Sequence, residues 1–140
     1  MTDFNAFSSR APMGGYRSQA LTGPVIVWAL YLGGLVTGGF TTFIGLIVAY
    51  ALKGGSSEAA WSHHVFAIRT IWVGLAWALI AGALFAVGLP LTLVLIGFVL
   101  LKAALLIWGV LGLWFIARSV MGLVYAIKDE PYPRPRSWLI

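Results

Sequence analysis

Cysteine is absent from the 140 residues of this chain, and the acidic residues number only four. Without cysteine the chain has no disulfide bonds, no thiolate nucleophile and no cysteine ligands for a metal. Charged residues of both signs make up 9% of the chain, whereas a soluble domain carries roughly 25% to keep its surface wet. The chain lacks the side chains to cover a water-facing globule, so we expect its solvent to be largely lipid.

Hydrophobic residues make up 61% of the chain and gather in three long runs. Residues 25–52 contain no charge, residues 70–88 contain none either, and residues 91–127 are interrupted only by Lys102 and Arg118. A helix needs roughly 20 apolar residues to cross the hydrocarbon core of a bilayer. The runs therefore predict an all-α, polytopic membrane protein, with a turn or kink at Leu89-Pro90 between the second and third runs.

The first run is longer than one crossing requires, and it contains two pairs of glycines. It forms either one tilted helix or a short glycine-broken hairpin, whose candidate turn is Thr37, Gly38 and Gly39, because glycine adopts turn conformations easily. Each arm of such a hairpin is roughly 20 Å long at 1.5 Å per residue, short of the roughly 30 Å core. The hairpin would then be partly re-entrant, and we expect the other helices to cover its turn.

Basic residues flank the runs and are missing from the connection at residues 87–91. The positive-inside rule places basic flanks in the cytoplasm. A hairpin in the first run puts every basic flank on that side, whereas a single crossing does not. We therefore expect four membrane segments in a bacterial cytoplasmic (inner) membrane, with the N- and C-termini both cytoplasmic.

Three regions follow from these patterns. Residues 1–23 form a polar arm that we expect to be flexible and cytoplasmic. Residues 24–128 form the helical membrane domain. Residues 129–140 form an extended tail, because proline at every second position from 131 to 135 excludes a helix. The apolar end of this tail, which begins at Trp138, is expected to dock on a partner or return to the membrane interface.

The stretch WSHHVFAIRT precedes the second run and contains both histidines of the chain. Neighbouring helical positions point about 100° apart, so His63 and His64 do not readily face one metal, and we predict neither a metal nor a cofactor. Arg69 and Arg118 are expected to be anchors that extend to the membrane surface, or to pair with the few acids. His64, Arg69, Thr70 and Arg118 are the candidate interface or ligand site.

Two further features are candidates with two interpretations each. Lys102 is a candidate intramembrane charge, but it lies about 7 Å from the expected outer edge, so its side chain can also reach water. Small residues every four positions form a candidate helix-packing stripe, used either inside the chain or against a partner. Its members are Gly74, Ala78, Gly82 and Ala86.

The sequence contains no nucleophile–base pair, no paired carboxylates and no phosphate loop, and its basic residues form no stripe for nucleic acid. It therefore predicts a protein that is not an enzyme, a small accessory or structural subunit that packs with a larger membrane complex or with itself. Its partners would be the lipid bilayer and a membrane protein. Two alternatives stay open: a channel-like or protein-translocation component, and quinone or lipid headgroup binding at the cytoplasmic interface.

Three stretches carry a resemblance to a known family: LYLGGLVTGGFTTFIGLIVAYALK, SHHVFAIRTIW and WFIARSVMGLVYAIKDEPYPRPRSWLI. From about residue 25 onward the chain resembles small bacterial membrane proteins of unknown function related to the Tic-twenty component of chloroplast inner-envelope protein import. A histidine before an Arg-Thr pair matches His64, Arg69 and Thr70, and an Arg-x-x-x-Gly step matches Arg118 and Gly122. The resemblance implies four helical segments with both termini cytoplasmic, and it implies no activity.

Overall fold

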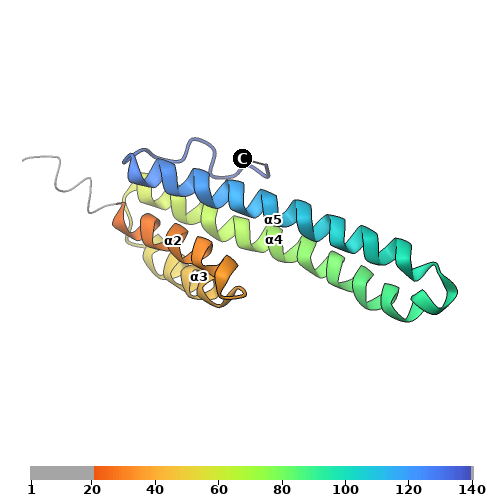
Figure 1. Ribbon diagram of the computed structural model, residues 1–140. Helices are drawn as coiled ribbons and strands as arrows, with labels where there is room; N and C mark the ends of the chain where they lie inside the picture. Colours follow the sequence, from red (N-terminus) through yellow and green to blue (C-terminus); the bar gives the residue numbers. More distant parts are fainter. Residues whose placement is uncertain (1–20, 140) are drawn as a thin grey trace, which may run out of the picture.

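The computed structural model describes residues 21–139, and all regular structure in that part of the chain is helical. Helices α2 (Thr22–Val36) and α3 (Phe40–Lys53) form a short hairpin. Helix α4 (Glu58–Leu91), the 3-10 turn η2 (Thr92–Val94) and helix α5 (Gly97–Ile127) form a much longer one (Figure 1). The predicted all-α class is confirmed, while most of the predicted flexible arm lies outside the described residues.

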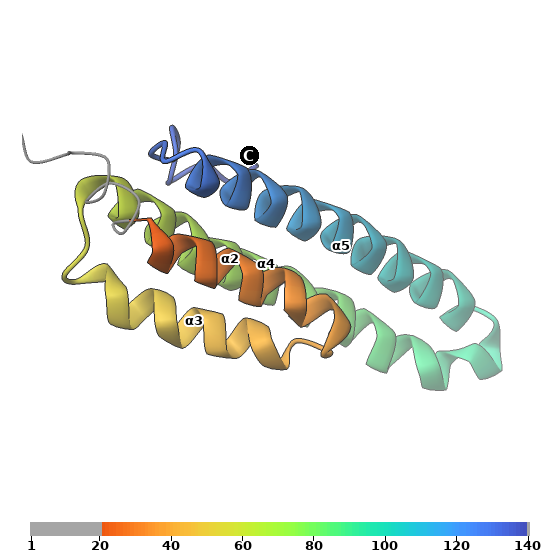
Figure 2. The same cartoon turned by 60° about the vertical axis from the view of Figure 1, so that its left-hand side comes forward.

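The short hairpin covers only one half of the long hairpin. Helix α4 has 34 residues, or about 51 Å at 1.5 Å per residue, whereas α2 has 15, or about 22 Å. Helix α2 packs against α3, α4 and α5, and α3 packs against α2 and α4. The far halves of α4 and α5 extend beyond them side by side (Figures 1 and 2). We call this two-helix extension the stalk.

The predicted hairpin turn is confirmed, but its surroundings differ from the expectation. Gly38 and Gly39 have φ angles of 63° and 93°, a left-handed conformation that favours glycine. No other helix covers the turn, since nothing lies within 4 Å of a Cβ placed on Gly38. Local hydrogen bonds satisfy its polar groups instead: the Gly39 N–H donates to the Gly34 carbonyl at 2.7 Å, and the Thr41 N–H donates to the Thr37 hydroxyl at 3.3 Å.

The connection between the long helices comes later than predicted. Helix α4 continues through Pro90 to Leu91, and the chain reverses over residues 92–96. A proline removes only one helical hydrogen bond, and membrane helices tolerate that loss. The expected turn at Leu89-Pro90 is therefore wrong by a few residues. At the other end, the Ser57 hydroxyl accepts from the Ala60 N–H at 3.4 Å and caps α4.

Small residues line the contact between α4 and α5, at a spacing of seven rather than four. Ala81 and Gly88 are buried, and a Cβ on Gly88 would meet Leu100 at 3.0 Å. A step of seven residues rotates by only about 20° around a helix, so Gly74, Ala81 and Gly88 keep to one face. On α5, Gly97 and Ala104 repeat the same spacing, and both are buried.

The predicted four-residue stripe is wrong as an internal packing surface at Gly82 and Ala86, its last two members. A step of four residues rotates by about 40°, so the stripe turns away from α5 along its length. A Cβ on Gly74 would lie 3.9 Å from Trp114, but one on Gly82 would meet nothing within 4 Å. Ala86 is exposed.

The two long helices present apolar side chains to the outside. Both stretches, Glu58–Val94 and Gly97–Ile127, are long and apolar enough to cross a membrane, and only 11% and 6% of their most apolar windows are buried. A core helix of a soluble protein would be mostly buried. Large side chains such as Leu79 of α4 and Val99 of α5 are 66% and 69% exposed, which predicts an apolar surrounding.

Candidate functional site

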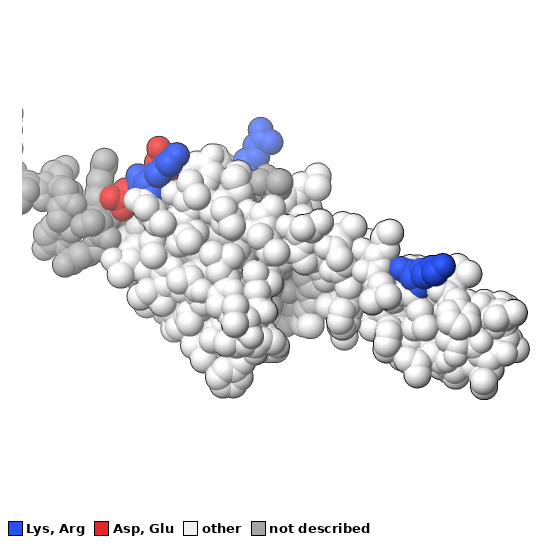
Figure 3. Space-filling view, viewed as in Figure 1, with Lys and Arg blue, Asp and Glu red and all other residues white. Residues whose placement is uncertain are grey.

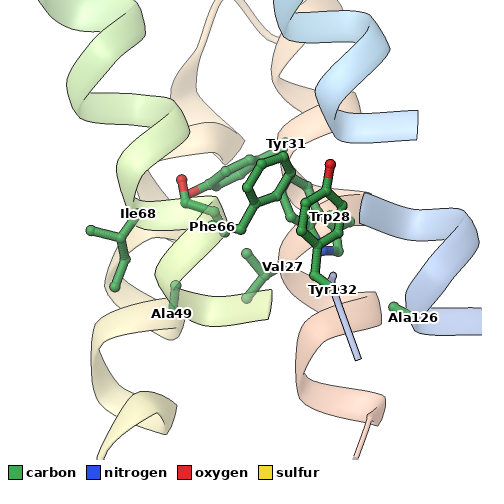
Figure 4. Close-up of a cluster of buried hydrophobic side chains, with 9 residues drawn as sticks. Val27, Trp28, Tyr31, Ala49, Phe66, Ile68, Ala126 and Tyr132 are labelled. Atoms are coloured by element: carbon green, nitrogen blue, oxygen red, sulfur yellow. The ribbon is translucent and has the colours of Figure 1, made fainter. Parts of the chain in front are cut away.

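The buried core lies where the two hairpins and the C-terminal tail meet (Figure 4). The Trp28 ring lies 5.5 Å from that of Tyr31 and 5.6 Å from that of Phe66, between ring centroids. A Cβ on Gly122 would overlap the Trp28 indole, so the absence of a side chain on α5 lets α2 approach. This aromatic core positions the polar side chains next to it.

Arg118 of α5 is the central polar residue of the site, and it is 0% exposed. Its Nε donates to the Thr70 hydroxyl of α4 at 3.0 Å, and its Nη1 donates to the carbonyls of Ser137 and Leu139 at 3.3 and 2.9 Å. The guanidinium carbon lies 3.9 Å from the centroid of the Phe66 ring. The prediction that Arg118 extends to the membrane surface is wrong, because these contacts turn it inward.

Thr70 is oriented by its own helix. Its hydroxyl donates to the Phe66 carbonyl one turn earlier at 2.7 Å, which leaves the oxygen lone pairs to accept from Arg118. Residues four apart share a helix face, so Phe66 offers its ring and Thr70 its hydroxyl to the same guanidinium. The structure thus brings together Thr70 and Arg118 from the predicted site.

His64 belongs to a different part of the molecule from Arg118. A Cβ on Gly23, at the start of α2, would lie 3.7 Å from the His64 Nε2. His63, which the predicted site omits, faces the tail instead: its Nε2 lies 2.9 Å from the Glu130 carbonyl oxygen. His63 precedes Thr70 by seven residues, so both lie on one face of α4. The seven-residue spacing between His63 and Thr70 could have identified His63, rather than His64, as the histidine that lies on the same face as Thr70.

The described part of the C-terminal tail folds back along its own helices. Tyr132 is only 4% exposed, and its ring stacks on Phe66 with centroids 3.7 Å apart. The Tyr132 N–H donates to the Ser62 hydroxyl at 3.0 Å, and the Trp114 indole donates to the Leu139 carbonyl at 3.1 Å. Burial raises the pKa of the Tyr132 phenol, so this ring stays neutral at physiological pH. The helices therefore hold the tail through the stacked Tyr132 ring and through hydrogen bonds to the tail backbone.

Arg69 lies beside this centre without joining its hydrogen bonds. The side chain is half-buried, and its guanidinium carbon lies 5.1 Å from the centroid of the Trp138 ring. Arg69 and Arg118 repel each other. No carboxylate of the described residues forms an ion pair with either arginine, so the expected pairing of the arginines with acids is wrong within residues 21–139.

The remaining predicted residues lie elsewhere. Lys102 is exposed on α5 near the far end of the stalk, and the turn at Thr37 is exposed at the end of the short hairpin. Within residues 21–139, no group of three His, Cys, Asp or Glu side chains is placed to hold a metal ion.

Several buried polar atoms around the core have no hydrogen-bond partner. They are Trp28 Nε1, His63 Nδ1, His64 Nδ1, Arg118 Nη2, Ser119 Oγ and Ser137 Oγ. An unpaired buried donor costs about 1–3 kcal/mol, and more when it is charged. Arg118 therefore forms a buried cationic centre with an unpaired donor in apolar surroundings, an arrangement suited to holding carbonyl or anionic oxygens.

In comparisons with protein-family models, curated proteins and solved structures, none matches this chain. The resemblance to the Tic-twenty-related family accordingly stays a prediction.

Proposed function

We propose that this chain is a non-enzymatic, integral protein of a bacterial cytoplasmic membrane, a small accessory or structural subunit that packs through its stalk against a larger membrane complex or against a second copy of itself. The observation that carries the proposal is the stalk itself. There α4 and α5 cover only each other, and their large side chains face outward, among them Leu79, Phe85, Val99 and Leu105. A two-helix unit buries little of its own surface, and partner helices would bury more of it.

The proposed topology has four membrane segments of unequal depth. The Tyr31 hydroxyl donates to the Ala67 carbonyl at 3.2 Å, and α2 continues for five residues, or about 7 Å, beyond Tyr31. From Ala67, α4 continues for about 36 Å to Leu91. Helices α4 and α5 would therefore span the bilayer, while the α2–α3 hairpin would enter from the cytoplasmic side and return.

Charge supports this orientation. On the face seen in Figure 3, acidic and basic side chains gather at the end where α5 ends, another basic group lies farther along, and one basic group lies near the far end of the long helices. Basic flanks remain cytoplasmic in most bacterial membrane proteins. Both termini would then be cytoplasmic, as the resemblance to the Tic-twenty-related family also implies.

The test is photo-crosslinking in intact membranes of the native host. A photoreactive amino acid at Phe85, which is exposed on the stalk, should yield a discrete adduct of higher mass, identified by mass spectrometry. The matched control is the same group at Ala81, which is buried between α4 and α5 and should give only products within the chain. A discrete adduct that contains a second protein or a second copy supports the proposal. Lipid adducts alone at Phe85 would refute it.

A further inference from the structure

An apolar groove lies between the two long helices and the tip of the C-terminal tail. Its volume is about 400 Å³, within the range of small-molecule sites. The side chains that form its walls include Val73 and Trp77 of α4, Leu106 and Trp114 of α5, and Trp138 and Leu139 of the tail. We call it the tail groove. Its lining is almost entirely apolar, so it fits a hydrocarbon chain.

One end of the tail groove is cationic. Arg69 lies over the ring of Trp138 at 5.1 Å, and Arg118 lies over the ring of Trp114 at 4.8 Å. Both indoles line the groove. Within residues 21–139 neither guanidinium pairs with a carboxylate. Two like charges beside an apolar groove, with no carboxylate of the described residues paired to them, favour an anionic group at that end.

We infer that the tail groove binds one anionic phospholipid, with an acyl chain between α4 and α5 and its phosphate beside Arg69. This inference rests on the membrane location proposed above. Arg69 is half-buried, so it keeps donors free for a phosphate, while the field of the buried Arg118 favours the negative charge. The tail forms one wall, so an ordered tail and a bound lipid stabilise each other.

The experiment counts lipids retained by the full-length protein in native mass spectrometry, after mixing with equal amounts of phosphatidylglycerol and phosphatidylcholine in detergent. The wild-type protein should retain one phosphatidylglycerol per chain in clear preference to phosphatidylcholine. Leu106→Trp places an indole in the groove and should weaken this retention by about tenfold. The matched control is Leu105→Trp, one position away, exposed and outside the groove, which should retain lipid as the wild type does.

A second pair of variants tests the charge. Arg69→Gln should abolish the preference for phosphatidylglycerol, whereas Arg134→Gln, an exposed arginine of the tail, should leave it unchanged. Equal retention of the two lipids by the wild type would overturn the inference, and so would equal losses in Leu106→Trp and Leu105→Trp. Adding inorganic phosphate should not displace the lipid; displacement would show that a free anion is bound instead.

These outcomes are separable from those of the proposed function. If the chain needs no detergent for extraction from membranes, the membrane location fails and the lipid site fails with it. If extraction needs detergent and lipid retention is unselective, only the lipid site fails. The photo-crosslinking at Phe85 reports on the stalk and is independent of lipid retention.

Discussion

Arg118 is a cation with no exposed surface and no carboxylate partner among residues 21–139. Neighbouring neutral groups stabilise it. Its donors reach the Thr70 hydroxyl and two tail carbonyls, and its flat face rests on aromatic rings. Arginine suits this position better than lysine, because a planar guanidinium stacks on rings while its edge donates several hydrogen bonds. The stability of the site therefore depends on each acceptor.

Removal of the Thr70 hydroxyl should destabilise the protein with little change in shape. In Thr70→Val the Arg118 Nε loses its acceptor at a buried position, and we expect a loss of about 1–3 kcal/mol in the free energy of unfolding. The measurement is denaturant unfolding in detergent, followed by circular dichroism. Thr92→Val is the matched control: its hydroxyl also donates to a carbonyl one turn earlier, Leu89, but at an exposed position. A loss in Thr92→Val as large as that in Thr70→Val would contradict the assigned role of Thr70.

At the scale of elements, the tail acts as a fifth packed segment. Tyr132 inserts between Phe66 and Tyr125, with ring centroids 3.7 and 5.4 Å away, and the buried ring holds the extended chain to α4. Without that ring, the tail would keep only a few backbone hydrogen bonds. Proline at alternate positions limits the conformations of the free tail, so docking loses less entropy.

Tyr132→Ala should release the tail. The nearest tryptic site within the tail is the Arg136–Ser137 bond, and the Ser137 carbonyl is bound to Arg118. We expect cleavage there to accelerate by about tenfold or more, because loss of a buried aromatic ring costs about 3–5 kcal/mol. Tyr132→Phe keeps the ring and should cleave at the wild-type rate. Equal cleavage rates in wild type and Tyr132→Ala would show that the tail is not held by this residue.

At the scale of the whole molecule, the two hairpins differ in depth, and this difference defines the proposed topology. Among the helices of residues 21–139, only α4 and α5 are long enough to cross a bilayer. The exposed turn at residues 37–39 lies beside the middle of the long hairpin and satisfies its own polar groups. A turn of this kind can enter lipid with little cover from protein.

The topology predicts opposite accessibility at the two ends of α4. The chain has no native cysteine, so a single introduced thiol reports one position. In intact spheroplasts, Thr92→Cys should react with a membrane-impermeant thiol reagent. Ser57→Cys, in the connection that the proposal places in the cytoplasm, should react only after permeabilisation. Labelling of Ser57→Cys without permeabilisation would reverse the proposed orientation.

The helix-packing stripe of α4 and the pair His63 and His64 are two features whose orientation the sequence did not predict correctly. Small residues recur in α4 at spacings of both four and seven, and nothing local chooses between them. Packing of α4 along its antiparallel neighbour α5 selects the spacing of seven, because a step of seven residues keeps the small residues on one face. The same geometry brings His63, rather than His64, to the side of α4 that meets the tail.

The sequence by itself determined the helical class and the apolar exterior, and it offered a turn at Gly38 and Gly39 as one of two alternatives for the first run. These depend on composition, on the length of uncharged runs and on the conformational freedom of glycine, which are all local properties. Only the tertiary structure decided that Arg118 is buried and that the tail covers it. Burial depends on which helix faces meet over a separation of many residues, here Thr70 with Arg118 and Arg118 with Leu139, and no local pattern encodes that meeting.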